Sequence, residues 1–136
     1  MNTVEIFMIV DDDRDDITLM SEAIQKMCSS SKFVFAHNGE EALYKLKNEL
    51  LSLPDYLFLD LNMPGMGGKA FLSKIKKDVK LKNIPIVIAS TSSNYRDREE
   101  TRKLGAVHFM TKPSSFSDLC SEIIEIVTRL RKIQTE

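Results

Sequence analysis

Short apolar runs alternate with amphipathic stretches five times along the chain, and this alternation limits the fold more than any other feature of the sequence. Runs such as YLFL and IPIVIA are hydrophobic at nearly every position, which is typical of strands covered on both faces in a parallel sheet. We therefore predict five strands, which lie in the runs Ile6 to Val10, Phe33 to Ala36, Tyr56 to Leu59, Ile84 to Ala89 and Val107 to Met110.

The stretches between these runs have the periodicity of helices, although the fourth, from Asn94 to Leu104, is weaker because it is highly charged. The predicted core-facing positions of the other four are Ile17, Met20, Ala23, Ile24 and Met27; Ala42, Leu43, Leu46 and Leu50; Ala70, Leu72, Ile75 and Val79; and Leu119, Ile123, Ile124, Val127 and Leu130. Such alternation predicts an α/β fold with right-handed crossovers. The strand count favours a doubly wound, flavodoxin-like parallel sheet of order 2-1-3-4-5 with five helices.

The composition indicates a soluble, cytoplasmic protein of one domain. The 136 residues are 43% hydrophobic and 29% charged, as in ordinary globular domains. The net charge of −1 argues against direct nucleic-acid binding, which needs a basic surplus, and no apolar run is long enough to span a membrane. Cys28 and Cys120 stand outside any metal or redox spacing, so we expect both to be reduced thiols.

The residues that come after the apolar runs form a coherent chemical set. Asp11 and Asp12 end the first run and Asp60 ends the third. Ser90 ends the fourth run and Lys112 the fifth. In open α/β sheets, ligands bind outside the carboxyl ends of the strands, where the strand order reverses. We therefore predict one pocket that contains three carboxylates, a hydroxyl and a lysine.

The chemistry of this set favours a divalent cation and a phosphoryl group. Two carboxylates about 4 Å apart repel by roughly 4 kcal/mol at an effective dielectric constant near 20, so three of them need a cation. Oxygen ligands without a nearby His or Cys select a hard ion such as Mg²⁺, which usually awaits phosphate oxygens. The lysine and the hydroxyl can take the other phosphoryl oxygens, and phosphoryl transfer requires mostly such positioning and charge neutralisation.

The remaining acids of the first cluster have a simpler interpretation. Asp13, Asp15 and Asp16 lie where the first helix begins, and acids at a helix start interact favourably with the helix dipole. We expect these three side chains to face solvent. Ser90 alone would indicate a loop hydroxyl and Lys112 alone a surface lysine, so the prediction of a site depends on their joint occurrence at the strand ends.

Four motifs link the chain to a known family. They are IVDDD (residues 9–13), LFLDLNMPGMGG (57–68), IVIASTS (86–92) and LGAVHFMTKP (104–113). With these motifs in this order, the chain resembles the receiver domain of bacterial two-component response regulators, of the single-domain, chemotaxis-regulator-like kind, over residues 4–132. Since the sequence ends soon after the last predicted helix, we expect residues 1–136 to form one receiver domain without an output domain.

The resemblance implies a role for each residue of the predicted pocket. Asp60 would accept the phosphoryl group, and Lys112 would contact it. Mg²⁺ would be bound directly by Asp12, Asp60 and the backbone carbonyl of Asn62. Asp11 would act on the metal largely through water.

The resemblance also implies a switch. Ser90 would be the switch hydroxyl and Phe109 the switch aromatic. Thr91 stands where many receivers have alanine, and its larger side chain is expected to narrow access to the phosphoryl group. The peptide bond between Lys112 and Pro113 is typically cis in this family, a form tolerated mainly before proline.

The function implied by the resemblance is a signalling switch and not that of an enzyme, although receivers catalyse their own phosphorylation and dephosphorylation. A histidine kinase or a phosphotransfer protein would donate the phosphoryl group, and Asp60 would hold it. A surface made of residues 94–104, the fifth strand and the last helix would then contact a downstream protein or a second copy of the chain in a homodimer.

Three other functions are disfavoured by particular residues. An aspartyl phosphatase or phosphotransferase generally needs an acid two residues after its nucleophile, where this chain has Asn62. A degenerate receiver that serves only as a binding platform is disfavoured by the complete set of acids, hydroxyl and lysine. A flavodoxin-type cofactor protein would need a Ser-, Thr- or Gly-rich phosphate loop after the first strand, where this chain has acids.

Overall fold

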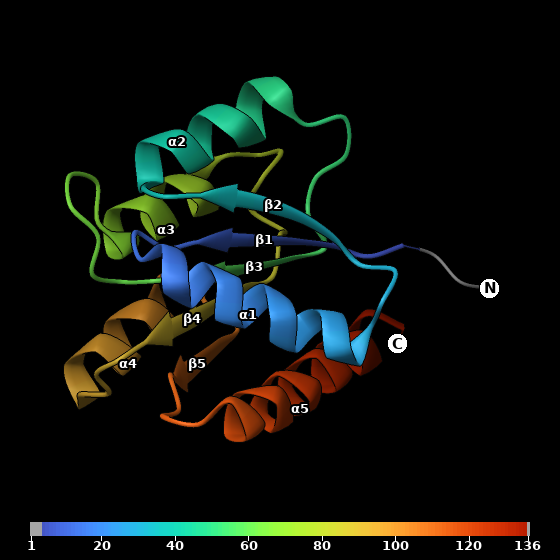
Figure 1. The fold of residues 1–136 in the computed structure, drawn as a ribbon. Coiled ribbons are helices and arrows are strands. Elements are labelled where there is room, and N and C mark those ends of the chain that lie inside the picture. The colour runs from blue at the N-terminus through green and yellow to red at the C-terminus, as the bar shows by residue number, and fades with distance from the viewer. Residues whose placement is uncertain (1–3, 136) are drawn as a thin grey trace.

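The structure, a computed structural model, describes residues 4–135 and has the predicted α/β architecture (Figure 1). The strands are β1 (Ile6–Val10), β2 (Lys32–Ala36), β3 (Tyr56–Leu59), β4 (Ile86–Ser90) and β5 (His108–Thr111). The helices are α1 (Arg14–Met27), α2 (Gly39–Tyr44, extended by a π-helical turn over Lys45–Glu49), α3 (Gly68–Lys77), α4 (Tyr95–Lys103) and α5 (Phe116–Thr135). All strand pairs are parallel and their order is β2-β1-β3-β4-β5, which confirms the predicted doubly wound sheet. Within residues 4–135, no helix has both the length and the hydrophobicity to cross a membrane.

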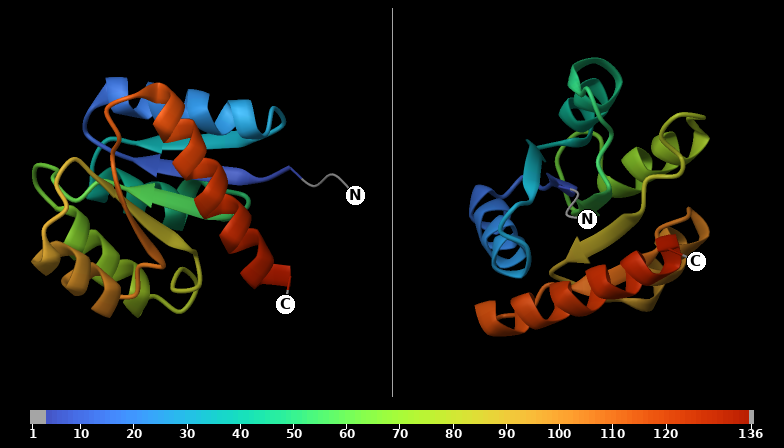
Figure 2. Two further views of the ribbon diagram at one scale, coloured as in Figure 1. Left: turned by 90° about the horizontal axis from the view of Figure 1, so that it is seen from below. Right: turned by 90° about the vertical axis from the view of Figure 1, so that its right-hand side faces the viewer.

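The sheet lies between two layers of helices (Figures 1 and 2). One face is covered by α1 and α5, and the other by α2 and α3, with α4 beside α3. In β1, Phe7 and Ile9 belong to the core under α1 and α5, whereas Met8 and Val10 belong to the core on the opposite face. Because successive strand residues point to opposite faces, a strand with two covered faces must be apolar throughout. This double burial explains the unbroken apolar runs in the sequence.

Three apolar residues that the helical pattern assigned to the core, Ala70, Val79 and Ile124, are exposed instead. The reason is clear for Val79 and Ile124. Val79 is 79% exposed because α3 ends before it, and the carboxylate of Asp78 accepts two backbone hydrogen bonds from the turn that follows the helix. Ile124 is 46% exposed because Ile123 and Val127 occupy the buried face of α5. Both assignments were wrong for the same reason, since spacing alone does not fix where a helix ends or which edge of its apolar stripe is covered.

Side-chain caps fix the start of α1, α2 and α4, which leave the carboxyl edge of the sheet. The carboxylate of Asp13 accepts hydrogen bonds from the backbone N–H groups of Asp15 and Asp16 at the start of α1. Asn38 and Asn94 cap α2 and α4 in the same way. The polar loops at this edge are therefore held in defined positions, which matters for the side chains that converge there.

Gly68 lies where α3 begins, directly against the end of β3. Its backbone N–H donates to the carbonyl of Leu61 at 3.0 Å. A Cβ atom at this position would lie 2.5 Å from the carbonyl oxygen of Asp60 and 2.6 Å from the Cα atom of Leu61. At Gly67, by contrast, the nearest atom to such a Cβ would be 3.7 Å away. The close approach of α3 to β3 therefore requires glycine at position 68 but not at position 67.

We expect Gly68→Ala to lower the free energy of unfolding by about 1–3 kcal/mol, because the new methyl group must displace main-chain atoms in a packed region. Gly67→Ala is the matched control and should change that free energy by less than about 0.5 kcal/mol. Urea denaturation followed by far-ultraviolet circular dichroism measures both values. Equal losses in the two variants would contradict the close approach at Gly68.

Candidate functional site

Three carboxylates meet at the carboxyl edge of the sheet, as the sequence predicted. Asp11 and Asp12 follow β1, and Asp60 follows the neighbouring strand β3. One carboxylate oxygen from each of the three lies within 4.8 Å of the others. Asp11 and Asp60 are buried, with exposed fractions of 3% and 7%, whereas Asp12 is exposed. Backbone hydrogen bonds continue the sheet past the strand ends and hold both buried acids, from Asp11 to Ala36 at 3.0 Å and from Asp60 to Val10 at 2.9 Å.

Lys112 is the cation among these acids. Its ammonium group donates hydrogen bonds to Asp11 Oδ2 at 2.7 Å and to Asp16 Oδ2 at 2.9 Å. Its distance to Asp60 Oδ1 is 3.8 Å, which is an ion pair but not a hydrogen bond. The side chain of Lys112 is only 11% exposed, so these charges interact in a partly dehydrated pocket. Lys112 therefore lies nearer to the β1–α1 side of the pocket than to Asp60.

Burial and charge crowding change the protonation equilibria of the pocket. Burial raises the pKa of Asp60 to about 6, and the nearby charge of Asp11 adds to this effect, while Lys112 and a hydrogen bond from the Asn62 backbone oppose it. Burial also raises the pKa of Asp11 above its ordinary value, against the hydrogen bond from Lys112. Although burial acts to lower it, the pKa of Lys112 is raised by its hydrogen bonds to Asp11 and Asp16. The pocket therefore favours an added positive charge, and its oxygen donors suit a hard divalent cation.

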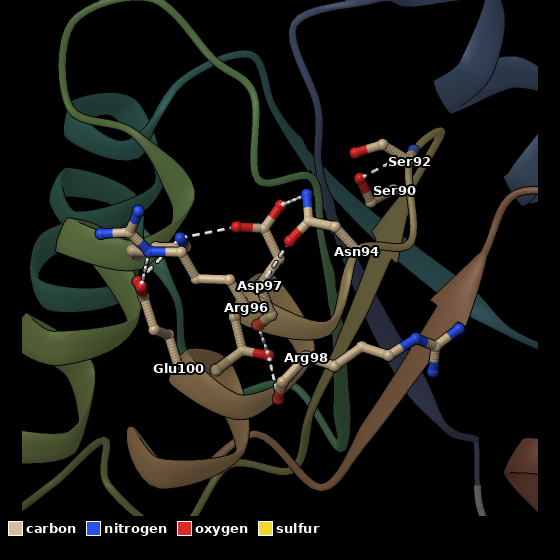
Figure 3. A network of polar contacts seen from close by, with 9 residues as sticks. Ser90, Ser92, Asn94, Arg96, Asp97, Arg98 and Glu100 are labelled. Atoms are coloured by element: carbon tan, nitrogen blue, oxygen red, sulfur yellow. Dashed lines mark hydrogen bonds and ion pairs between the residues drawn. The ribbon is translucent and has the colours of Figure 1, made fainter.

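Ser90 is fully buried at the end of β4. Its hydroxyl accepts a hydrogen bond from the backbone N–H of Ser92 at 3.3 Å (Figure 3). Its backbone carbonyl accepts a hydrogen bond of 2.7 Å from the backbone N–H of Lys112, which joins the ends of β4 and β5. The next residue, Thr91, is exposed. The predicted switch hydroxyl therefore lies at the expected strand end, and it forms a hydrogen bond within the loop that follows this strand.

Phe109 is partly buried on β5 and lies beneath a cation. The guanidinium carbon of Arg98, from α4, is 4.7 Å from the centre of the Phe109 ring. Arg98 also donates a hydrogen bond to Thr111 Oγ1 at 3.1 Å, and Figure 3 shows its side chain reaching from α4 toward β5. Sequence reasoning did not find this contact, because a charged helix gives no signal for which of its residues faces the sheet.

α4 is also attached to α3 by charge. Lys69, near the start of α3, forms ion pairs with Asp97 at 2.7 Å and with Glu100 at 2.8 Å. Arg96 also pairs with Glu100, at 2.7 Å (Figure 3), so that the Glu100 carboxylate contacts two cations. The side chains of these groups are partly or fully exposed, and ion pairs at a protein surface contribute little stability each. They nevertheless orient the charged helix, which buries few apolar residues of its own.

The peptide bond between Lys112 and Pro113 is trans, since the described residues contain no cis peptide bond. The cis bond implied by the family resemblance is therefore not found. The two isomers of a bond before proline differ by only about 0.5–1 kcal/mol, so the surroundings of the bond decide which one is adopted. A Lys-Pro motif alone does not fix the isomer.

Asp16 is the pocket residue that the sequence analysis assigned wrongly. It was expected to face solvent with the other acids of the helix start, but its carboxylate contacts Lys112. Its neighbour Asp15 is exposed, as predicted. The sequence did not distinguish the two neighbouring acids, because Asp16 and Lys112 are 96 positions apart and meet only when α1 is seated on the sheet.

Comparison with known families supports the resemblance drawn from the motifs. The family described as "Response regulator receiver domain" matches residues 7–124 of the chain. The matched region contains every residue of the pocket and the whole sheet apart from Ile6, and it ends within α5.

Individual relatives agree with this match. The crystal structure of the phosphorylated cyanobacterial phytochrome response regulator RcpA is similar with a TM-score of 0.84 and 33% identity, over 91% of each chain. Response regulator Rcp1 of Synechocystis is 28% identical over 87% of this chain and 83% of that protein. A Mn²⁺-bound crystal structure of Rcp1 has a TM-score of 0.79 at 26% identity, over 90% of this chain and 91% of that one.

A longer relative matches only in part. The protein-glutamate methylesterase/protein-glutamine glutaminase of Methanococcoides burtonii is 34% identical over 125 residues, which is 88% of this chain but 34% of that protein. The chain therefore spans about a third of that relative and most of Rcp1.

The raised pKa of Asp60 predicts how pH affects stability without metal. The native Asp60 carboxyl binds its proton more tightly than the unfolded one. Ionisation of the buried carboxyl therefore lowers the free energy of unfolding, by nothing below about pH 4 and by most above about pH 6. In EDTA at pH 7.5, we expect Asp60→Asn to raise the free energy of unfolding by about 2–3 kcal/mol. The gain should shrink toward pH 4.5. Urea denaturation of both proteins across this range measures it, and a gain independent of pH would contradict the raised pKa.

Proposed function

Because this chain belongs to the response regulator receiver domain family, we propose that it receives its phosphoryl group on Asp60. The phospho-receiver role in two-component signalling follows from the family itself. The observation that supports Asp60 as the acceptor is its position, buried at the end of the central strand β3, with two other carboxylates and a lysine around it. The relative RcpA has been crystallised in a phosphorylated form.

The donor in this proposal is a phosphorylated histidine of a histidine kinase or of a phosphotransfer protein. One carboxylate oxygen of Asp60 forms the new bond to phosphorus while the bond between phosphorus and the donor nitrogen breaks, and the electron pair of that bond stays on the donor. The attacking carboxylate must be ionised. With a pKa of about 6, Asp60 is mostly ionised at neutral pH even without a metal. Lys112 lies 3.8 Å from the acceptor carboxylate and carries the positive charge that a transferred phosphoryl group needs.

The metal in this proposal is Mg²⁺. Receiver domains bind a divalent metal at this acidic pocket, and the relative Rcp1 has been crystallised with Mn²⁺. Asp12, Asp60 and the backbone carbonyl of Asn62 would hold the ion directly, and Asp11 would do so through water. Carboxylate and carbonyl oxygens are the donors that Mg²⁺ prefers. When bound, it neutralises charge on the phosphoryl oxygens.

Ser90 and Phe109 are the residues proposed to carry the change to the surface. The Ser90 hydroxyl would turn from the Ser92 N–H toward the phosphoryl oxygens, and the Phe109 ring would fill the space left behind β4. The guanidinium group of Arg98, on α4, lies over that ring and donates a hydrogen bond to Thr111. Movement of the ring must therefore alter the contact between β5 and α4. A packed interior favours such discrete alternatives over continuous deformation.

The output surface in this proposal consists of α4, β5 and α5. It would contact a downstream protein or a second copy of the chain, and the contact would depend on phosphorylation.

The domain would also phosphorylate itself slowly from small phosphoryl donors and lose the phosphoryl group by hydrolysis. The exposed Thr91, beside Ser90, would limit the access of water to that group. The receiver core of the proposal comprises residues 4–132.

Asp60→Asn should abolish acid-labile, hydroxylamine-sensitive labelling by radioactive acetyl phosphate, because the amide is a far weaker nucleophile than the carboxylate. Asp118→Asn, which changes an exposed acid of α5, is the matched control and should label as the wild type does. Labelling of the wild type should also require Mg²⁺ and disappear in EDTA. If Asp60→Asn labels as strongly as the wild type, the acceptor lies elsewhere.

Amide hydrogen exchange with and without beryllofluoride tests the output surface. We expect altered protection in residues 94–104, around Phe109 and along α5, because the proposed movement of the ring changes their packing. The same experiment on Asp60→Asn should show no change, since the mimic has no carboxylate to bind. Changes confined to the loops around Asp12 and Asp60 would show that the signal does not leave by this surface.

A further inference from the structure

Two carboxylates compete with Asp60 for the ammonium group of Lys112. Asp11 Oδ2 lies at 2.7 Å and Asp16 Oδ2 at 2.9 Å, whereas Asp60 Oδ1 lies at 3.8 Å. An ammonium group has three N–H donors, and the two hydrogen bonds use two of them. Asp60 is beyond hydrogen-bond distance, so the resting position of Lys112 is set by the other two acids.

The position of Asp16 is fixed by the way α1 begins. The carboxylate of Asp13 accepts hydrogen bonds from the backbone N–H groups of Asp15, at 2.9 Å, and Asp16, at 3.3 Å. This cap holds the first turn of the helix, and the side chain of Asp16 leaves that turn toward the pocket, where it is 29% exposed. Asp15 is adjacent in sequence but faces solvent. A rigid turn therefore presents one of two neighbouring acids to Lys112.

We infer that Asp16 is a positioning residue that holds Lys112 on the α1 side of the pocket and thereby limits how readily Lys112 reaches a phosphoryl group on Asp60. The inference rests on the proposed function, in which Lys112 contacts that group. Asp11 is drawn toward the metal in the same proposal, through water. Asp16 is not among the proposed metal ligands, so it remains to compete with the phosphoryl group for the ammonium.

The direction of the effect follows from charge. A phosphorylated side chain carries about −1.5 to −2 charges and strong acceptor oxygens, which attract Lys112 away from Asp16. The transition state for transfer already has charge on these oxygens, so part of the Lys112–Asp16 attraction must be lost before transfer is complete. An asparagine in place of Asp16 keeps the shape of the side chain but removes its charge. Lys112 is then freer to move toward Asp60, and phosphorylation is faster.

The experiment measures initial rates of labelling by acetyl phosphate at saturating Mg²⁺ in the full chain. Asp16→Asn should raise the rate roughly 1.5–5-fold, the range that corresponds to a partly exposed ion pair. Asp16→Ser, a second neutral variant, should raise it in the same range. Asp16→Glu keeps the charge and should stay close to the wild-type rate. Unchanged or slower labelling in both neutral variants would overturn the inference.

Asp15→Asn is the matched control, because it removes the same charge from the same helical turn without touching Lys112. It should leave the rate close to that of the wild type. If Asp15→Asn accelerates labelling as much as Asp16→Asn does, the effect comes from the overall charge of the turn, and a specific role of Asp16 is excluded.

A double-mutant cycle with Lys112→Gln separates positioning from general structure. In that slower background, Asp16→Asn should no longer change the rate, because the partner that Asp16 positions is gone. A persistent acceleration would overturn the inference. Asp60→Asn in the same assay tests the proposed function separately. If Asp60→Asn is not labelled and the wild type is labelled normally, the proposed function stands, whatever the result for Asp16. If Asp60→Asn is fully labelled, the proposed function has failed.

Discussion

Charge crowding at the carboxyl edge of the sheet is the constraint on which the rest of the site depends. The neighbouring strands β1 and β3 bring Asp11 and Asp60 together, and Asp12 completes a group whose oxygens lie within 4.8 Å of one another. Burial alone would disfavour such a cluster. Burial, together with the charge of Asp11, raises the pKa of Asp60, and Lys112 offsets only part of this effect, so the pocket favours an added positive charge. The same imbalance that weakens the metal-free site prepares it for metal and phosphoryl groups.

A continuous set of contacts leads from this pocket to the surface. The backbone N–H of Lys112 donates a hydrogen bond to the carbonyl of Ser90, so the lysine and the proposed switch hydroxyl lie on one pair of strand ends. Phe109 lies on the same strand as Thr111, and Arg98 joins both to α4. α4 in turn is joined to α3 mainly by exposed ion pairs. A helix held in this way can change position at little cost, since each surface ion pair is worth about 1 kcal/mol or less.

The rigid part of the molecule has a different origin. Two apolar cores lie on either side of strands that are buried on both faces, and the site is built on the ends of those strands. The tight approach of Gly68 to the backbone of Asp60 and Leu61 shows how closely α3 is packed against the end of β3. The acids are therefore held by a stiff sheet, while α4, which is expected to move, is held largely by polar contacts. The structure thus separates the chemistry from the response.

The sequence by itself determined the fold class, the strand order and the pocket side chains at the strand ends, because these follow from local periodicity, from the number of strands and from the residue type at each strand end. It did not place Asp16 in the pocket. The tertiary structure alone decided which acid holds Lys112. Asp16 and Lys112 are 96 positions apart, and their contact depends on how α1 is seated on the sheet. It also decided the trans bond before Pro113 and the exposure of Val79 and Ile124. Residue patterns specify which elements form, whereas contacts between distant elements depend on packing geometry that no single segment contains.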